Sequence, residues 1–301
     1  MKGNRSSATA YLIAVSTVFL SKSLSMGHLV PARSAELSKR FISMRSRFAR
    51  WLSQALVAEA LRPLVDALER WTIPGIQLHY ALRKRYLEEV AREALTDGIR
   101  QVVAFGAGFD TLLLRLHEGF PTAQFIEIDH PATQEIKSRA LARYSLSKDN
   151  LRLIGLDLAR ESREGALLSS ICAPTGAQTL FIAEGLLMYL DPTEVDGLLR
   201  FACQHSAQAS RLAFTFMESD PQGRIAFRGS SWAVGVWLRW KGEPFKWGIS
   251  RERLVDYLAA RGFIVREIMS AGTLSNRYLA PDHLAHLPLA DGECICVAER
   301  V

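Results

Sequence analysis

The chain has 301 residues, 49% of them hydrophobic, and carries a net charge of +6. This length and composition suit one large globular domain with an appended cap and exclude a disordered chain. Its four cysteines are scattered and form no C-x-x-C pair, so neither a disulfide framework nor a zinc site is indicated, and the reducing cytoplasm is the expected location.

The first third of the chain is its basic part. Residues 1–100 hold 16 lysines and arginines against 8 acids, whereas the remainder holds 21 against 23. A basic surface can attract RNA or an acidic membrane, but a solvated helical face is the simpler interpretation. We therefore expect neither nucleic acid nor a membrane as a partner. The basic cluster consists of Lys39, Arg40, Arg45, Arg47 and Arg50.

The apolar run Ala8 to Leu20 has basic residues before it, as the core of a signal peptide would. However, Ser16 and Thr17 interrupt the run, no A-x-A cleavage site follows, and the run is too short to span a bilayer. We interpret it as a helix that packs on the rest of the protein. Further helices, broken by glycine and proline, are expected up to about residue 75.

A strand, a glycine turn, a helix and a second strand are predicted between Gln101 and Asp129. The apolar run 102–105 is typical of a strand buried on both faces of a parallel sheet. Gly106-Ala107-Gly108 follows at once, and two glycines let the backbone turn tightly beside a ligand. The second strand ends in Asp129, where a carboxylate can accept hydrogen bonds from both hydroxyls of an adenosine ribose.

This pattern fits two classes of cofactor. Nicotinamide dinucleotides require a third glycine, but Asp110-Thr111 stands there instead. An acid in the turn would repel a pyrophosphate, whereas it would tolerate S-adenosylmethionine (SAM), which is cationic and has no phosphate. The residues therefore favour SAM, and an α/β turn that binds nothing is the alternative.

The remaining strands predict a doubly wound α/β fold. Apolar runs at 151–155, 179–183 and 211–217 alternate with helical segments, and the runs at 263–268 and 294–298 read as an antiparallel pair at one edge. The expected architecture is a seven-stranded, mostly parallel sheet with helices on both faces and a helical cap.

Three segments in this order resemble the successive motifs of the leucine carboxyl methyltransferase family. They are VVAFGAGFDTLLLRL, FIEIDHPATQEIK and AEGLLMYL, and the match runs from about residue 82 to 190 and more loosely through 247–263. The family holds SAM-dependent O-methyltransferases, so the resemblance implies a class I, Rossmann-like methyltransferase fold. It implies a helical cap over residues 1–75, a core over 76–301, and a segment at 221–248 that covers the acceptor.

The resemblance also implies which residues bind SAM. Arg83, in LRKRYLEE, would hold the carboxylate of SAM, Glu184 its ammonium, Asp129 its ribose, and Asp157 with the amide of Leu158 its adenine. A guanidinium suits a carboxylate because it can bind it bidentately. Helix capping by Asp157 is the rival interpretation. The implied cofactor-binding residues are Arg83, Gly106, Ala107, Gly108, Asp129, Asp157, Leu158 and Glu184.

The methyl acceptor is less well specified. Tyr189 could border the methyl-transfer site or simply pack, and His130 is expected on the adenosine side rather than as a general base. Tryptophans 232, 237, 240 and 247 could stack on a flat substrate or form the core of the cap. We expect a small-molecule carboxylate or hydroxyl acceptor and no metal. A protein or peptide C-terminal carboxyl methyltransferase and an RNA-associated SAM-binding protein are the alternatives.

Overall fold

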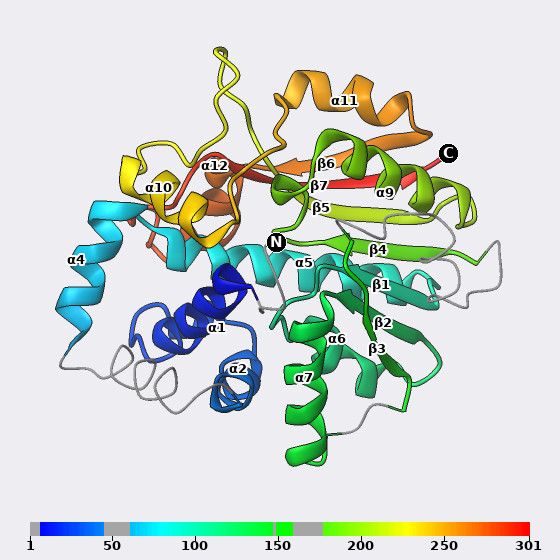
Figure 1. The fold of residues 1–301 in the computed structure, drawn as a ribbon, viewed down its shortest axis with the longest axis horizontal. Helices are drawn as coiled ribbons and strands as arrows, with labels where there is room; N and C mark the ends of the chain where they lie inside the picture. The colour runs from blue at the N-terminus through cyan, green and yellow to red at the C-terminus, as the bar shows by residue number, and fades with distance from the viewer. Residues whose placement is uncertain (1–6, 45–60, 147–148, 159–176) are drawn as a thin grey trace.

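The computed structural model describes residues 7–44, 61–146, 149–158 and 177–301, and seven strands of these residues form one sheet (Figure 1). The strand order is β3-β2-β1-β4-β5-β7-β6, and every pairing is parallel except those of β7. The strands are β1 (Gln101–Phe105), β2 (Gln124–Asp129), β3 (Leu151–Gly155), β4 (Thr179–Ala183), β5 (Arg211–Met217), β6 (Phe263–Met269) and β7 (Glu293–Arg300).

The predicted fold class is confirmed, with one refinement at the edge of the sheet. β6 and β7 do pair antiparallel, but β7 lies between β5 and β6 and pairs antiparallel with both. β7 therefore has neighbours on both sides, and its residues from Glu293 to Ala298 are buried. The parallel strands β1 and β4 at the centre are buried along their whole length, as apolar runs in a doubly wound sheet should be.

Helices cover both faces of the sheet. One core joins α1, α2, α5, α6, α7 and α12 to one face, and a second core joins α9 and α11 to the other. The helices are α1 (Ala8–Leu20), α2 (Ser34–Ser43), α4 (Arg62–Thr72), α5 (Ile76–Thr96), α6 (Leu112–Leu116), α7 (Pro131–Arg143), α9 (Pro192–Gln204), α10 (Trp232–Lys241), α11 (Arg251–Ala259) and α12 (Ala271–Leu274).

The N-terminal helices pack on the sheet domain. Val15 and Val18 of α1 and Leu37 and Phe41 of α2 are buried in the same core as α5 and α6. The apolar run is thus a packed helix, as predicted, and no helix among the described residues is long and apolar enough to cross a membrane. Of the basic cluster, the segment 45–50 lies outside the described residues. The domain boundary at residue 75 stays a prediction.

A buried lysine of α7 binds the backbone of the glycine turn after β1. Lys137 of α7 is fully buried, and its Nζ lies 2.5 Å from Oε2 of Glu127 on β2. The same ammonium donates a hydrogen bond to the backbone carbonyl of Asp110 at 2.6 Å. Burial raises the pKa of Glu127, and Lys137 opposes that rise. Because both charged groups are buried away from water, each needs the other as its counter-charge.

We expect Lys137→Met to destabilise the fold by about 3 kcal/mol, because it leaves the Glu127 carboxylate buried and uncompensated. Urea denaturation would measure the loss. The double variant Lys137→Met/Glu127→Gln should recover part of it, since it removes both charges. Equal stability of the single and double variants would show that the ion pair does not support the turn.

Candidate functional site

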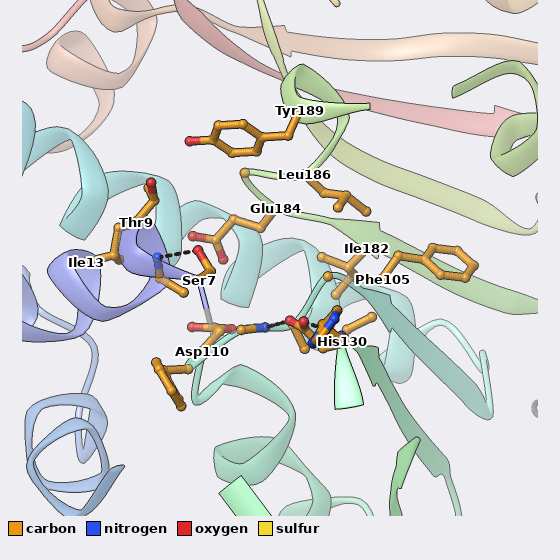
Figure 2. A pocket seen from close by; sticks show the side chains of 18 of the residues that line it. Ser7, Thr9, Ile13, Phe105, Asp110, His130, Ile182, Glu184, Leu186 and Tyr189 are labelled. Carbon is orange, nitrogen blue, oxygen red and sulfur yellow. Dashed lines mark hydrogen bonds between the residues drawn. The ribbon is translucent and has the colours of Figure 1, made fainter. Parts of the chain in front are cut away.

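A cavity opens at the carboxyl ends of β1, β2 and β4 and is covered by α1 (Figure 2). Its lining comes from the glycine turn after β1, from the residues that follow β2, β3 and β4, and from Ser7 to Thr17 of the N-terminal segment. Open α/β sheets bind ligands at this edge, where the strand order reverses on either side of the first strand. The cavity is therefore the candidate active site.

The turn after β1 brings the backbone itself to the cavity. Gly106 and Gly108 have φ values of +63° and +52°, which side chains rarely tolerate. A Cβ on Gly106 would lie 2.7 Å from Cδ1 of Leu186. The Gly106 amide donates to the carbonyl of Ile128 at 2.8 Å, which ties the turn to β2. Both glycines are thus required by conformation, as the sequence indicates.

Asp129 holds the turn as well as facing the cavity. Its Oδ2 accepts a hydrogen bond from the Gly108 amide, and its Oδ1 accepts one from the His130 amide at 2.5 Å. Burial raises the pKa of Asp129, and these two amides oppose the rise. A carboxylate can accept about four hydrogen bonds, so two places remain for hydroxyls of a ligand.

Asp157 and Leu158 line the cavity after β3, beside His130. The Nε2 atom of His130 lies 3.9 Å from Oδ2 of Asp157, and its Nδ1 atom accepts from the Ala132 amide at the start of α7. His130 is thus placed next to Asp129 and Asp157. That this is the adenosine side of the cavity stays a prediction.

Glu184, after β4, is held by two adjacent cations of α5. Its Oε1 lies 2.8 Å from Nη2 of Arg83 and 3.0 Å from Nζ of Lys84. Arg83 also reaches Glu293 of β7, with Nη1 2.8 Å from Oε1. The two terminal nitrogens of Arg83, which were expected to bind the carboxylate of SAM, therefore already face carboxylates of the protein. That Arg83 binds SAM stays a prediction. In the structure, Arg83 orients Glu184.

Lys84 also neutralises Asp110. Its Nζ lies 2.6 Å from Oδ1 of Asp110, and Oδ2 of that acid accepts from the Leu112 amide. Burial alone would raise the pKa of Asp110, but Lys84 lowers it far below its usual range. The acid in the turn is thus paired, which weakens the expectation that its free charge would repel a pyrophosphate. No local sequence pattern indicates this pairing of Lys84 with Asp110.

The far end of the cavity is bordered by Tyr189, Glu243 and Lys246. Burial raises the pKa of the Tyr189 phenol well above its usual range. Oε1 of Glu243 accepts from the Ala8 amide at 3.0 Å and Oε2 from the Thr9 amide at 3.2 Å, so this buried acid holds α1 over the cavity. No local sequence pattern predicts this contact, since it joins residues more than 230 positions apart.

The tryptophans of the segment 221–248 lie outside the cavity lining and do not share one core. Trp247 is buried in the core beneath α9 and α11, whereas Trp232 and Trp240 are exposed. None of the four is among the lining of the cavity formed by the described residues. From this segment, the cavity instead receives Gly242, Glu243 and Lys246.

The predicted site residues do come together. All eight implied cofactor-binding residues and Tyr189 line the one cavity, although they derive from five separate segments of the chain (Figure 2). Figure 2 shows Tyr189, Glu184 and Asp110 around the cavity, with Ser7 and Thr9 of the N-terminal segment beside them. Among the described residues, no cluster of histidine, cysteine and acid is placed to hold a metal.

Comparison with known proteins identifies the family. The family model for leucine carboxyl methyltransferases matches residues 28–203. A protein of Mycobacterium marinum, provisionally named a SAM-dependent methyltransferase, is 35% identical over 233 residues, which cover 71% of this chain and 75% of that one. The chain belongs to the leucine carboxyl methyltransferase family.

Two further similarities agree with this family assignment. A second M. marinum protein of the same provisional name is 27% identical over 91% of this chain and 86% of its own. The solved structure of a provisionally assigned methyltransferase from Thermobifida fusca has a TM-score of 0.56 at 17% identity, covering 81% and 89% of the two chains. That structure supports the fold alone. The family match and the first M. marinum relative identify the present chain as a SAM-dependent methyltransferase.

We expect Gly106→Val to lower SAM affinity by more than about tenfold, because its side chain would meet Leu186 and resist the positive φ. Calorimetry with SAM measures the loss, and thermal denaturation checks folding. Gly119→Val is the matched control, since a Cβ there meets nothing within 4 Å. Unchanged SAM affinity in a folded Gly106→Val variant would show that the turn does not bind the cofactor.

Two acids at different places of the cavity should discriminate between ligands. Asp129→Ala should weaken both SAM and adenosine about 10- to 150-fold, since a hydrogen bond to a charged acceptor contributes about 1.5–3 kcal/mol. Glu184→Gln should weaken SAM but leave adenosine, which lacks the amino-acid part, nearly unchanged. Competition titrations with both ligands give the comparison. The opposite ranking would mean that the cofactor lies reversed in the cavity.

Proposed function

We propose that the enzyme transfers the methyl group of SAM to a carboxylate oxygen of a small molecule, forming a methyl ester. The observation that carries the proposal is the chemistry of the cavity end near Tyr189. It offers a proton donor but, among the described lining residues, no unengaged base, and its cation Lys246 is paired with Asp191. A carboxylate is already ionised near pH 7 and needs no base, whereas an alcohol or phenol acceptor would need one.

Each acid at this end is engaged elsewhere. Glu243 accepts from the N-terminus of α1, and Glu184 faces Arg83 and Lys84. Because its pKa is raised, Tyr189 stays protonated at neutral pH, so it can donate a hydrogen bond to an acceptor oxygen but cannot remove a proton. Lys246 also lines the cavity, where its Nζ lies 3.0 Å from Oδ2 of Asp191, so its positive charge already has a partner.

The chain's own residues fit SAM. The glycine turn presents backbone rather than side chains to the cavity, Asp129 has acceptor capacity for the ribose, and Oε2 of Glu184 can accept from an ammonium. Asp157 and Leu158 would hold the adenine. When bound, SAM supplies the activated methyl group and its own leaving group. The protein contributes orientation and a covered site that excludes water.

The cover of the cavity favours a small acceptor. Glu243 binds the first amides of α1, and a side-chain hydrogen bond from Thr9 reaches the same carboxylate at 2.5 Å. These bonds close the roof beside Tyr189, where a protein C-terminal tail would need a groove. This geometry therefore does not favour the alternative activity, a protein C-terminal carboxyl methyltransferase.

The test uses methyl-labelled SAM and a cell extract separated into metabolites, proteins and RNA. We expect label in the metabolite fraction, released by mild alkali as volatile methanol, because esters hydrolyse in base and methyl ethers do not. The folded Asp129→Ala variant is the control and should transfer little label. Alkali-stable label in metabolites would indicate a hydroxyl acceptor, and label confined to proteins or RNA would refute the proposal.

A further inference from the structure

α4 presents an apolar stripe to solvent rather than to the core. Leu64, Leu68 and Trp71, spaced three or four residues apart, are 65%, 54% and 60% exposed, and no residue of this helix is buried. An amphipathic helix normally turns such a stripe inward. A stripe of this kind left in water indicates a binding surface.

α10 continues this surface with a second stripe. Trp232, Val236 and Trp240, at four-residue spacing, are 78%, 44% and 75% exposed. The Ser231 amide donates to the carbonyl of Thr72 at 2.9 Å, so α10 begins where α4 ends, and both lie at the same end of the molecule (Figure 1). We call the combined surface the α4/α10 patch: Leu61, Leu64, Leu68, Trp71, Trp232, Val236 and Trp240.

The charges on the two helices are mainly positive. The two acids are Asp66 and Glu69, and Glu69 accepts a hydrogen bond from the Gln77 backbone amide at 3.2 Å. No ion pair joins the cations of these helices to an acid in the described part of the chain. The Arg62 guanidinium lies 4.9 Å from the centroid of the buried Phe19 ring, and Nζ of Lys241 lies 3.9 Å from that of Trp240. The four cations are Arg62, Arg70, Arg239 and Lys241.

Exposed tryptophans beside cations that pair with none of the described acids match the interface of an anionic membrane. Tryptophan concentrates at the level of the lipid headgroups, where its ring is buried and its N–H stays wet, and lysine and arginine are attracted to anionic lipids. A second copy of the chain is the less suitable occupant. A two-fold interface pairs the same patch with itself, so like charges would approach each other with few acids between them.

We propose that the α4/α10 patch attaches the enzyme to the surface of membranes that contain anionic lipids, without spanning them. This departs from the expectation of no membrane partner, which considered only spanning segments and the basic N-terminal third. α10 is followed directly by Gly242 and Glu243, which line the cavity and hold its roof. The patch is therefore joined along the chain to the segment that holds the cover of the cavity.

The test is co-sedimentation of the full chain with vesicles at low ionic strength. We expect binding to vesicles of phosphatidylglycerol and phosphatidylcholine in equal parts, and much weaker binding to phosphatidylcholine alone. The triple variant Trp71→Ala/Trp232→Ala/Trp240→Ala should lower the partition coefficient at least about tenfold. Arg239→Gln/Lys241→Gln should reduce both the preference for phosphatidylglycerol and the salt dependence.

Matched controls keep the test specific. Val255→Ala and Ile264→Ala remove exposed apolar side chains on α11 and β6, outside the patch, and should bind vesicles like the unaltered chain. SAM affinity, measured for every variant, should not change, which shows that the fold and the cofactor site are intact. The proposal is overturned if the unaltered chain does not sediment with anionic vesicles or if the control variants lose as much binding. It is also overturned if light scattering shows a dimer that the triple variant dissociates.

Discussion

The site depends on two adjacent cations buried on one helix. Arg83 and Lys84 of α5 are both buried, and a buried cation is tolerated only with well-placed partners. Their carboxylates come from three places: Asp110 in the glycine turn, Glu184 after β4, and Glu293 on β7. The ion pairs between these cations and carboxylates fix α5 against the sheet. They also bring the glycine turn and Glu184 to one cavity before any ligand binds.

This network explains why Glu293 matters although it is outside the cavity lining. Burial would raise its pKa, but Arg83 and His79 lower it to about 2, so it stays ionised as a counter-charge. Without it, Arg83 would have one carboxylate fewer and could draw Glu184 out of position. The orientation of Glu184 toward the cavity thus depends on a residue of the last strand, more than 100 positions away.

The cover of the cavity and the proposed membrane surface share one segment. α10 presents its tryptophans to solvent, and the residues that follow it turn back to line the cavity and hold α1. Glu243 is buried where it meets the first amides of α1, so the roof depends on a charge-assisted contact rather than on apolar packing alone. A membrane bound at α10 would contact the segment next to this roof.

The sequence by itself determined the elements whose signals are local. Apolar runs predicted all seven strands, and Gly106 and Gly108 marked a turn that only glycine adopts easily. Three ordered motifs indicated the family and the set of residues that now line one cavity. These signals survive because burial on both faces of a strand, and a positive φ, constrain the residue at each position whatever the distant chain does.

Only the tertiary structure decided how distant segments meet. It placed β7 between β5 and β6, paired Asp110 with Lys84, turned Arg83 toward Glu293, and used Glu243 to hold α1. It also separated the tryptophans, burying Trp247 and exposing Trp232 and Trp240. An isolated acid or tryptophan carries no local sign of its partner, because its free energy depends on which charge or surface the folded chain brings to it.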